Sequence, residues 1–521
     1  MNKKIFFALF ALFALCVSIL PSKAQKEVDE QMRKLIISAI TINDHYVDTV
    51  NLEKLVENAI RGMIEKLDPH SAYSTPEETK KLNEPLQGSF DGIGIQFNIL
   101  DDTLLVVQTV TGGPSEKAGV MAGDRIISVN DTAIAGVKMP QEEIVKRLRG
   151  PRGTKAHLGI LRDGIDETIF IDVVRDKIPL NSVDASFMVN EETGLIRFSN
   201  FAATTHKEVV EAIEKLKGMG MKNLIIDVTQ NGGGYLQAAA EIASEFLPQG
   251  DMIVYTKGRA YPSQNFKSRG GNAFQEGKII VLVDEYSASA AEILAGAIQD
   301  QDRGFVVGRR TFGKGLVQRP IDLPDGSMIR LTVARYYTPA GRCIQKPYES
   351  IEKYNADLIE RYNRGEMMSA DSIHFPDSLK CSTLKKGRTV YGGGGIMPDY
   401  FVPVDTTLFT KYHSQLSNKG VLLKVHFQLI DAHRDEWAKK YPDYATFNRK
   451  FELSDKMMKQ LIAEGEKDGV KFDEEQYKKS ESLIKLQLKA LIARDLWDMN
   501  EYYHTINVVN ESVNKALELL E

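Results

Sequence analysis

Three short and almost wholly apolar runs constrain the fold of this 521-residue chain more than any other feature. The runs are Leu224–Val228, Ile279–Val283 and Phe305–Val307. A strand that is buried on both faces has no solvent side, so its sequence does not alternate between apolar and polar residues. Helical stretches lie between these runs, at Ala238–Leu247 and Ala291–Gln299. This alternation predicts a largely parallel sheet with crossover helices, an α/β core that we assign to residues 179–405.

The segments before this core have other patterns. Residues 25–85 repeat apolar side chains at steps of three and four, which predicts an N-terminal helical segment. Residues 86–178 alternate short β-like runs with turns, and one helix between Pro140 and Gly150 interrupts them. The expected strands of this small β-rich module are Leu104–Val107, Arg125–Val129, His157–Leu161 and Thr168–Val174.

Two further segments complete the predicted multidomain α/β fold. Residues 346–390 are polar and lack apolar periodicity, so we expect an insertion or a long loop there. Residues 406–521 form a helical region in which the last helix carries an apolar stripe on one face. The stripe fits packing within the chain and self-association equally well, and the sequence leaves that choice open.

Residues 1–24 are expected to be an export signal. Lys3 and Lys4 precede the apolar run Ile5–Leu20, and Ser22-Lys23-Ala24 forms a small-x-small cleavage site. The apolar run is short for a membrane span of about 20 residues, which favours cleavage over retention as an anchor. No later stretch is long and apolar enough to cross a bilayer. We therefore expect an exported protein that is soluble after signal cleavage, in the periplasm or cell envelope.

The charge and cysteine content exclude several classes of function. The formal net charge is −5, and removal of the leader makes it more negative, which argues against nucleic acid as a partner. Cys16 lies in the leader, and Cys343 and Cys381 alone do not make a disulfide scaffold; whether they pair stays open. No cluster of histidine, cysteine and acidic residues has metal-ligand spacing, so no metal site is expected.

One candidate nucleophile lies at the end of the second apolar run. There the chain passes from a predicted strand through Ser287, Ala288 and Ser289 into a predicted helix. A hydroxyl at this junction lies near backbone N–H groups and the positive end of the helix dipole, which stabilise a developing oxyanion. Taken alone, the pattern is better explained by an ordinary serine at a helix N-cap.

A candidate general base follows the third apolar run, where Gly313 and Gly315 flank Lys314. To accept a proton near neutral pH, this lysine needs its pKa lowered by two to three units from about 10.4, which costs about 3–4 kcal/mol. Apolar surroundings can supply that shift. The same segment also fits the GxxxxGK pattern of a phosphate-binding loop, but Gly315 occupies the place of the required Ser or Thr, which disfavours nucleotide binding.

Taken together, these segments resemble the carboxyl-terminal processing proteases, the tail-specific serine peptidases of the S41 type. The resemblance extends over nearly the whole chain, and it depends on the order and spacing of the matching segments. The matching pieces are Leu67–Ser71, Gly92–Ile95, Gly113-Pro114, Ala118–Val120, Gly123-Asp124, Ser287–Glu292, Thr311–Gly315, Gln318, Leu323–Ser327, Tyr336–Arg342 and Gly395–Asp399.

The resemblance implies a protease core of the ClpP/crotonase-like type and a set of site residues. Ser289 would be the nucleophile, Lys314 the general base, and Gln318 the residue that orients the lysine. Lys314 and Gln318 are four residues apart, so one helical turn would place them on the same face.

The resemblance also implies an oxyanion hole formed by the backbone N–H groups of Ala290 and a nearby glycine, for which we choose Gly233. The sequence departs from the family at this point. Thr229-Gln230-Asn231-Gly232 replaces the commoner Arg-x-Asn-Pro, so the choice of glycine stays open.

The family's second module is a PDZ domain, which corresponds here to the β-rich residues 86–178. Gly92, Ile93, Gly94 and Ile95 would form the loop that binds a substrate tail. Successive backbone N–H groups in such a loop can bind a terminal carboxylate, while the tail adds a strand to the sheet edge. Without the neighbouring protease motifs, the same glycines fit the turns of any small β-domain.

The hypothesis is therefore an exported serine endopeptidase that recognises protein C-termini through a PDZ domain and requires no metal or organic cofactor. The main alternative is a non-catalytic PDZ adaptor on a protease-like scaffold. A Ser-His-Asp hydrolase is a third, and it predicts inactivation by a single His→Ala change. Physiological substrates, regulatory or adaptor partners and self-association stay open.

Overall fold

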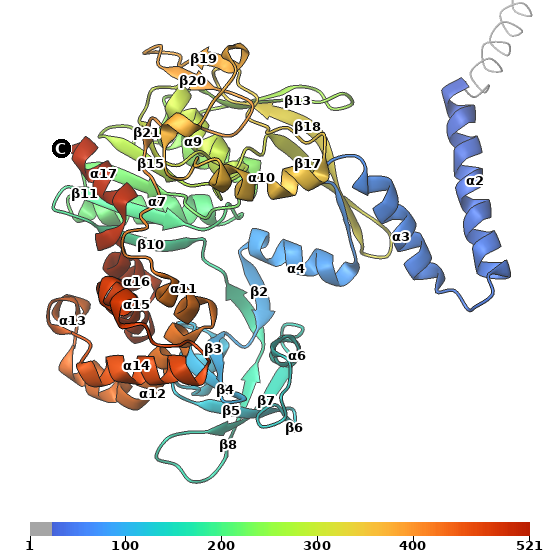
Figure 1. Ribbon diagram of the computed structural model, residues 1–521. Helices are drawn as coiled ribbons and strands as arrows, with labels where there is room; N and C mark the ends of the chain where they lie inside the picture. The colour runs from blue at the N-terminus through green and yellow to red at the C-terminus, as the bar shows by residue number, and fades with distance from the viewer. Residues whose placement is uncertain (1–22) are drawn as a thin grey trace, which may run out of the picture. The chain divides into compact units, whose positions relative to one another are not determined.

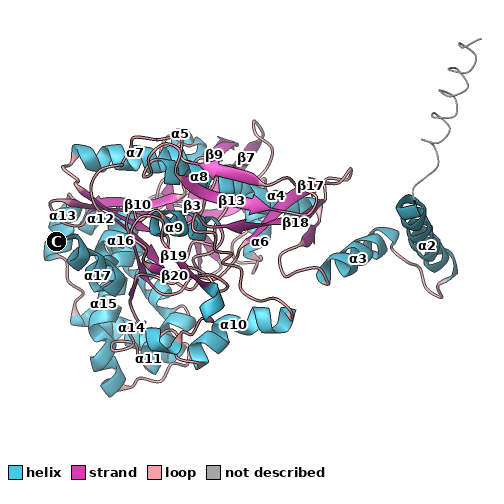
Figure 2. Cartoon of the chain, turned by 90° about the horizontal axis from the view of Figure 1, so that it is seen from above, coloured by secondary structure: helices cyan, strands magenta, loops and turns pink. Residues whose placement is uncertain are grey.

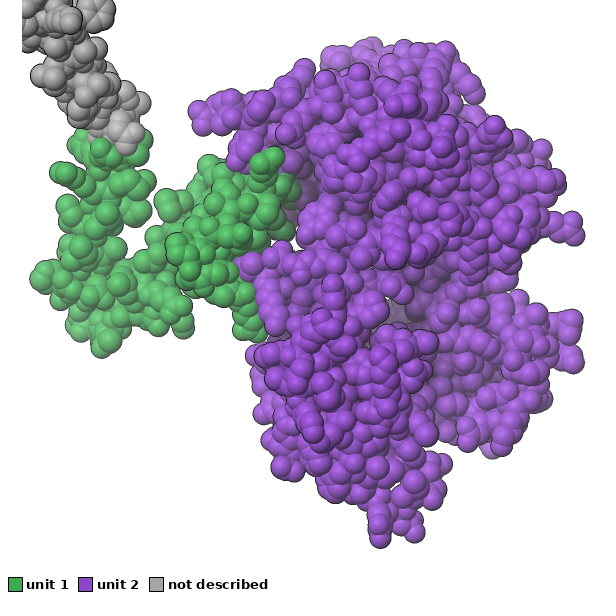
Figure 3. Space-filling view, turned by 180° about the vertical axis from the view of Figure 1, so that it is seen from behind, with its two compact units in different colours: residues 1–77, 318–332 green, residues 78–317, 333–521 purple. Residues whose placement is uncertain are grey.

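The computed structural model describes residues 23–521. The expected signal peptide at residues 1–24 therefore lies almost entirely outside the described residues. Two compact units are distinguished in Figure 3: one combines the described part of residues 1–77 with residues 318–332, and the other comprises residues 78–317 and 333–521. Within residues 23–521, none of the helices has the length and hydropathy needed to span a membrane.

The smaller unit consists of helices α2 (Lys23–His45) and α3 (Leu52–Glu65), strand β1 (Ala72–Ser74) and the hairpin residues 318–332. The hairpin is formed from strands β17 (Leu316–Asp322) and β18 (Met328–Tyr337), and β1 pairs antiparallel with the start of β18. Helix α2 exposes several large apolar side chains: Val28, Met32, Leu35, Ile36, Ile37 and Ile40. The predicted N-terminal helices are confirmed, but β1 was not foreseen.

The β-rich module in the larger unit contains the predicted strands. Its antiparallel sheet has the order β3 (Ile95–Leu100), β4 (Thr103–Thr109), β5 (Arg125–Val129), β7 (Lys155–Leu161), β8 (Ile169–Val174), with β6 (Thr132–Ala133) paired to β5. Helices α5 (Pro114–Ala118) and α6 (Gln141–Leu148) accompany the sheet. Helix α4 (Pro76–Gln87) precedes the module, and β2 (Ser89–Gly92) pairs with β9 (Asp176–Pro179) where the chain enters and leaves it.

The α/β core is a six-stranded sheet. Its order is β10 (Val183–Met188), β11 (Thr193–Phe198), β12 (Asn223–Asp227), β15 (Ile279–Val283), β16 (Phe305–Gly308) and β21 (Tyr400–Phe401). Figure 1 labels its strands β10, β11, β15 and β21. All neighbouring pairs are parallel except β10 with β11. The three apolar runs of the sequence are thus the adjacent central strands β12, β15 and β16, as predicted.

Both faces of this sheet are buried, which explains why its strands do not alternate in polarity. Ile226 and Val281 belong to the cluster that includes helices α7 (Thr205–Gly218), α8 (Leu236–Ser244) and α9 (Ala290–Asp300). Ile225 and Ile280 point to the opposite face, where they share a cluster with α17 (Glu511–Leu520). Antiparallel strands β13 (Met252–Lys257) and β14 (Gln264–Lys267) adjoin the core, with Tyr255 of β13 paired to Tyr337 of β18.

The C-terminal region is helical, as predicted, and appears as a group of cyan helices in Figure 2. Its helices are α11 (Lys411–Asn418), α12 (Val421–Lys440), α13 (Tyr444–Lys450), α14 (Asp455–Lys467), α15 (Glu474–Leu496), α16 (Met499–Ile506) and α17. Helices α11 to α15 have their own core, which includes the aromatic side chains of Tyr412, Trp437, Phe447 and Phe451. The apolar stripe of the last helix packs within the chain, on the sheet of the α/β core.

The segment 346–390 is not a featureless loop. It contains helix α10 (Ile351–Asn363), 3-10 turns at Ala370–Ser372 and Asp377–Leu379, and the paired strands β19 (Lys380–Ser382) and β20 (Thr389–Tyr391). The buried residues of α10 are Tyr354 and Arg361. Because one of these two anchors is charged, the helix lacks the apolar period on which the sequence-based expectation depended.

Candidate active site

Ser289 lies at the sharp turn between strand β15 and helix α9, where it is the N-cap of the helix. Its backbone angles are φ 55° and ψ −111°, which L-residues rarely adopt. Strain of this kind persists only where the surrounding structure enforces it, and it concentrates at functional sites. Part of the constraint comes from Glu292 in the first turn of α9, whose Oε2 accepts the Ser289 N–H at 2.8 Å.

The Glu292 carboxylate also binds the loop that carries Lys314. Oε2 accepts the backbone N–H of Lys314 at 2.9 Å, and Oε1 accepts the Gly313 N–H at 2.7 Å and the Thr311 hydroxyl at 2.5 Å. Burial raises the pKa of Glu292 to about 7, and these hydrogen bonds oppose that rise. The backbone nitrogens of Ser289 and Lys314 therefore share one acceptor atom, and the two residues lie side by side.

Tyr336 makes a second link between the same two residues. Its hydroxyl lies 3.1 Å from the carbonyl oxygen of Ser289 and 2.5 Å from that of Lys314. Burial raises the pKa of Tyr336 well above its usual range, so the phenol stays protonated and acts as the donor. Glu292 and Tyr336 thus hold the backbones of Ser289 and Lys314 through both N–H and C=O groups.

The loop that contains Gly233 packs directly against the serine turn. A Cβ at Gly233 would lie 2.8 Å from Ser289 Cβ and 2.9 Å from the Ala290 nitrogen, and its φ is +100°. Only glycine fits this position without strain. The Ala288 N–H donates to the Asn231 carbonyl at 2.9 Å, while the Gly233 N–H donates to Asn231 Oδ1 at 2.9 Å. An oxyanion stabilised by Gly233 would have to replace Asn231 as the acceptor.

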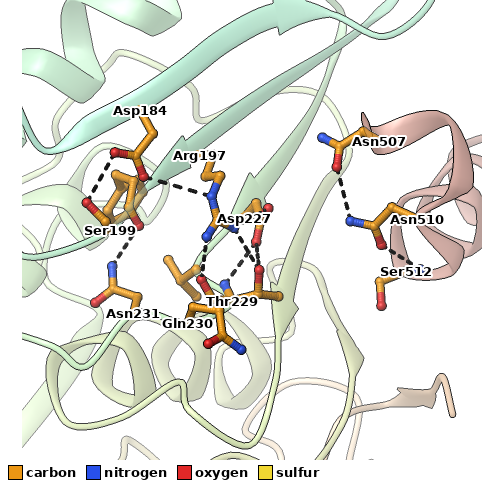
Figure 4. Close-up of polar contacts among 12 residues, drawn as sticks. Asp184, Arg197, Ser199, Asp227, Thr229, Gln230, Asn231, Asn507, Asn510 and Ser512 are labelled. Atoms are coloured by element: carbon orange, nitrogen blue, oxygen red, sulfur yellow. Dashed lines mark hydrogen bonds and ion pairs between the residues drawn. The ribbon is translucent and has the colours of Figure 1, made fainter. Parts of the chain in front are cut away.

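A buried charge network fixes the start of this loop (Figure 4). Arg197 on β11 donates to Asp227 at 2.7 Å, to the Thr229 hydroxyl at 2.7 Å and to the Thr229 carbonyl at 3.0 Å. Asp227 in turn accepts the Thr229 N–H at 2.9 Å. Asp184 lies 3.8 Å from Arg197; burial raises its pKa to about 6, and the attraction of Arg197 offsets only part of that rise.

Comparisons with known proteins agree on one family. Peptidase family S41 matches residues 192–352, a PDZ domain matches 92–173, the activating protease CtpB N-terminal domain matches 17–79, and a family of unknown function matches 412–498. The carboxy-terminal-processing protease of Bartonella bacilliformis is 37% identical over 309 residues, which cover 58% of this chain and 70% of the relative. The chain belongs to the carboxy-terminal processing proteases.

A second curated relative and one solved structure are also similar to this chain. The carboxy-terminal processing protease CtpA of Bacillus subtilis is 35% identical over 334 residues, covering 63% of this chain and 70% of CtpA. Among solved structures, the photosystem II D1 C-terminal processing protease is 29% identical with a TM-score of 0.34, and the match covers 59% of this chain and 88% of that one. The protein is a serine-type peptidase with a multidomain α/β fold that includes a PDZ domain.

In this protease, Gln318 does not lie one helical turn from Lys314 as predicted, because residues 316–322 form strand β17. The extended conformation follows from pairing of β17 with β18. The Gln318 amide donates to the Thr332 hydroxyl at 3.2 Å within the smaller unit. Its assignment as the residue that orients Lys314 stays a prediction.

The four predicted tail-binding residues of the PDZ domain lie together where its sheet begins. Gly92 ends β2, Ile93 is buried, Gly94 has a φ of +72°, and Ile95 begins β3. The Val110 N–H donates to the Gly94 carbonyl at 3.0 Å, which fixes the turn. β3 stands at one end of the strand order, so it is an edge strand of this sheet.

Two other sequence-based expectations concern cysteines and metals. Cys343 and Cys381 are both free thiols in the structure. Within the described residues, no group of three or more histidine, cysteine and acidic side chains is arranged to hold a metal ion.

In the sequence, Glu292 was noted only as the end of the matching segment Ser287–Glu292 and was assigned no role. A Ser-x-x-Glu pattern at the start of a helix predicts a capping box, which would have revealed the bond from Ser289 to Glu292. The same carboxylate also accepts hydrogen bonds from Thr311, Gly313 and Lys314. These bonds depend on tertiary structure, so no local sequence pattern predicts them.

Proposed function

We propose that this chain is an exported serine endopeptidase that cleaves peptide bonds with a Ser289–Lys314 dyad and selects substrates by their C-termini through its PDZ domain. The observation that carries the proposal is the pair of shared contacts at Glu292 and Tyr336, which place the backbones of Ser289 and Lys314 side by side. Two residues that are remote in sequence are thus kept at fixed relative positions, as a nucleophile and its base require.

The proposed cycle has two steps. Neutral Lys314 takes the hydroxyl proton as Ser289 Oγ attacks the substrate carbonyl, and the resulting ammonium gives that proton to the leaving amine. Water then hydrolyses the acyl-enzyme, with Lys314 accepting a proton from the water and returning it to Ser289. The Ala290 N–H, at the start of α9, is the donor proposed for the oxyanion, together with a group from the Gly233 loop.

The PDZ domain is proposed to supply tail selection. The turn at Gly94 leads directly into β3, an edge strand, so one ligand could place its carboxylate on the turn and its backbone along the edge. Recognition of this kind depends on a free terminal carboxylate. Amidation of a substrate's C-terminus is therefore expected to weaken its binding.

The test of the dyad is cleavage of an unstructured protein by the wild type, S289A and K314A, with the exposed-residue variants S263A and K353A as matched controls. We expect loss of cleavage in the first two variants and wild-type rates in the controls. A fluorophosphonate should give a single covalent adduct, located at Ser289 by peptide mapping. Persistent cleavage by S289A, or an adduct elsewhere, would refute the proposed nucleophile, and inactivation by a His→Ala change would favour a Ser-His-Asp mechanism.

The remaining parts of the proposal have their own measurements. A substrate with an amidated C-terminus should show a raised KM and an unchanged kcat relative to the free acid. Export with signal cleavage predicts that protein recovered from the cell envelope begins at Gln25, as N-terminal sequencing would report. Q318A tests whether Gln318 contributes to the reaction. If wild type, S289A and K314A were all inactive and still bound tails, the adaptor alternative would hold.

A further inference from the structure

Helix α10 contacts the loop that carries Lys314 through buried charged side chains. The helix lies in residues 346–390, most of which extend beyond residue 352, where the match to peptidase family S41 ends. We infer that α10 is a positioning element of the catalytic centre, which holds the loop residues 310–313 through Arg361 and Lys346. The inference depends on the proposed role of Lys314.

Arg361 holds two consecutive carbonyl groups of the loop. Its side chain is 1% exposed, and its two terminal nitrogens donate to the Arg310 carbonyl at 2.5 Å and the Thr311 carbonyl at 3.0 Å. A guanidinium is planar and presents its donors at fixed angles, so one side chain can fix the orientation of both peptide groups. A lysine at this position would be a single point donor.

Lys346 holds the next part of the same loop. Its backbone N–H donates to the Gly313 carbonyl at 2.9 Å. Its ammonium lies 4.0 Å from the centre of the Phe312 ring and 4.2 Å from that of Tyr354, and it donates to Asp357 at 2.9 Å. Tyr354 and Asp357 belong to α10, so a buried cation and two aromatic rings join the helix to Phe312.

Apolar side chains would attach a helix at lower cost than these buried cations. Arg310, Lys346 and Arg361 lie close to the two carboxylates Asp357 and Glu366, and their desolvation opposes folding. Burial, together with the like charge of Arg310, lowers the pKa of Arg361 to about 10. What Arg361 provides and an apolar side chain cannot is directional bonding to the loop carbonyls.

The loop backbone is therefore held from two sides. Arg361 of α10 binds the loop carbonyls at Arg310 and Thr311, and the Lys346 N–H binds the loop carbonyl at Gly313. On the other side, Glu292 accepts the loop N–H groups at Gly313 and Lys314. A displacement of about 1 Å at a reacting group can cost 100-fold in rate. Loss of the α10 contacts is accordingly expected to reduce catalysis while leaving substrate binding intact.

The experiment compares R361K, R361M and K346M with K353M, a matched lysine variant on the exposed face of α10. Each full-length protein is assayed for kcat and KM against pH, for the rate of fluorophosphonate labelling, and for thermal unfolding. We expect kcat to fall about tenfold in R361K and about 100-fold in R361M, with KM within twofold of wild type and the labelling rate reduced in parallel. K346M should lose about tenfold in kcat, and K353M should match the wild type.

Several outcomes would overturn the inference. Wild-type kcat in folded R361M and K346M would show that the loop does not need α10. A rise in KM alone, or a loss of kcat equal to the loss of folded protein, would reduce α10 to a binding or a purely structural element. If R361M does not fold, R361K, which keeps the buried charge, decides the question by the same kcat criterion. S289A and K314A are assayed in parallel. Cleavage by either of these variants would refute the proposed dyad itself. If both are inactive and R361K is fully active, only the proposed role of α10 is refuted.

Discussion

Glu292 Oε2 lies 2.9 Å from the backbone nitrogen of Lys314, across a gap of 22 residues in the sequence. The same oxygen accepts the Ser289 N–H. A single buried carboxylate thus fixes the backbone positions of the proposed nucleophile and the proposed base. This relationship, more than either residue alone, defines the site and leads to the first prediction below.

The first prediction concerns E292Q. An amide keeps the size of the side chain but turns one acceptor oxygen into an NH2 donor, which would face backbone N–H groups that are themselves donors. We expect kcat to fall about 100-fold, or about 3 kcal/mol of transition-state stabilisation, because Ser289 and Lys314 lose their common support. Steady-state kinetics measure the effect, and circular dichroism verifies the fold. A folded E292Q enzyme with wild-type kcat would contradict the proposed role of Glu292.

The second prediction concerns Y336F. Removal of the hydroxyl leaves the Ser289 and Lys314 carbonyls without their shared donor but preserves the packing of the ring. A hydrogen bond contributes about 0.5–1.5 kcal/mol, so we expect kcat to fall roughly three- to tenfold. Y337F is the neighbouring control, since Tyr337 stacks on Tyr255 instead. Equal rates in the two variants would argue against a contribution from the Tyr336 hydroxyl.

The third prediction compares two adjacent glycines. G233A places a methyl group 2.8 Å from Ser289 Cβ at a φ of +100°, so the loop or the serine turn must move. G232A adds its methyl group where no other atom lies within 4 Å. We expect cleavage to be lost in G233A and retained in G232A, as measured by peptide hydrolysis on proteins of verified fold. Full activity in G233A would mean that cleavage does not require the close approach of Gly233 to Ser289.

The fourth prediction is a pH dependence of stability. The pKa of Asp184 is about 6 in the folded protein, above its ordinary 3.8, so between these pH values the folded state holds a proton that the unfolded state has released. The group's contribution to stability therefore declines as pH rises from about 4 to 6. D184N has no such dependence. From pH 4 to pH 7 we expect D184N to gain about 2 kcal/mol in unfolding free energy relative to wild type, as urea titrations would show. If the difference in unfolding free energy between D184N and wild type did not change with pH, the raised pKa of Asp184 would be contradicted.

The fifth prediction tests the PDZ turn. Gly94 and Gly112 have nearly the same backbone conformation, with φ of +72° and +69°. A Cβ at Gly94 would lie 2.9 Å from the end of Ile178, whereas at Gly112 it meets no other atom within 4 Å. We expect G94A to weaken the binding of a peptide with a free C-terminus at least tenfold and G112A to leave it near wild type. Calorimetric titration measures both, and equal affinities would place the tail-binding site elsewhere.

A feature of the fold or of the site could be predicted from the sequence only where it left a local pattern in the sequence. Strands β12, β15 and β16 were predictable because burial on both faces makes a continuous apolar run. The strand-to-helix junction that carries Ser289 was predictable too, whereas the choice of Ser289 as nucleophile came from the family resemblance and stays a prediction. The four-residue step from Lys314 to Gln318 suggested a helix because spacing alone cannot distinguish a helix from a strand whose pairing partner comes later in the chain. Glu292 and Arg361 act through contacts with distant loop residues, which no local period reveals.

The packing of Val513, Ala516 and Leu520, on α17, against β12, β15 and β16 has a consequence for biogenesis. One side of the peptidase sheet is covered by residues that the ribosome adds well after the strands that they cover. A nascent chain would carry its complete set of proposed reactive groups long before it could shield that side from water. Competence to cut should therefore appear only after synthesis has passed α17.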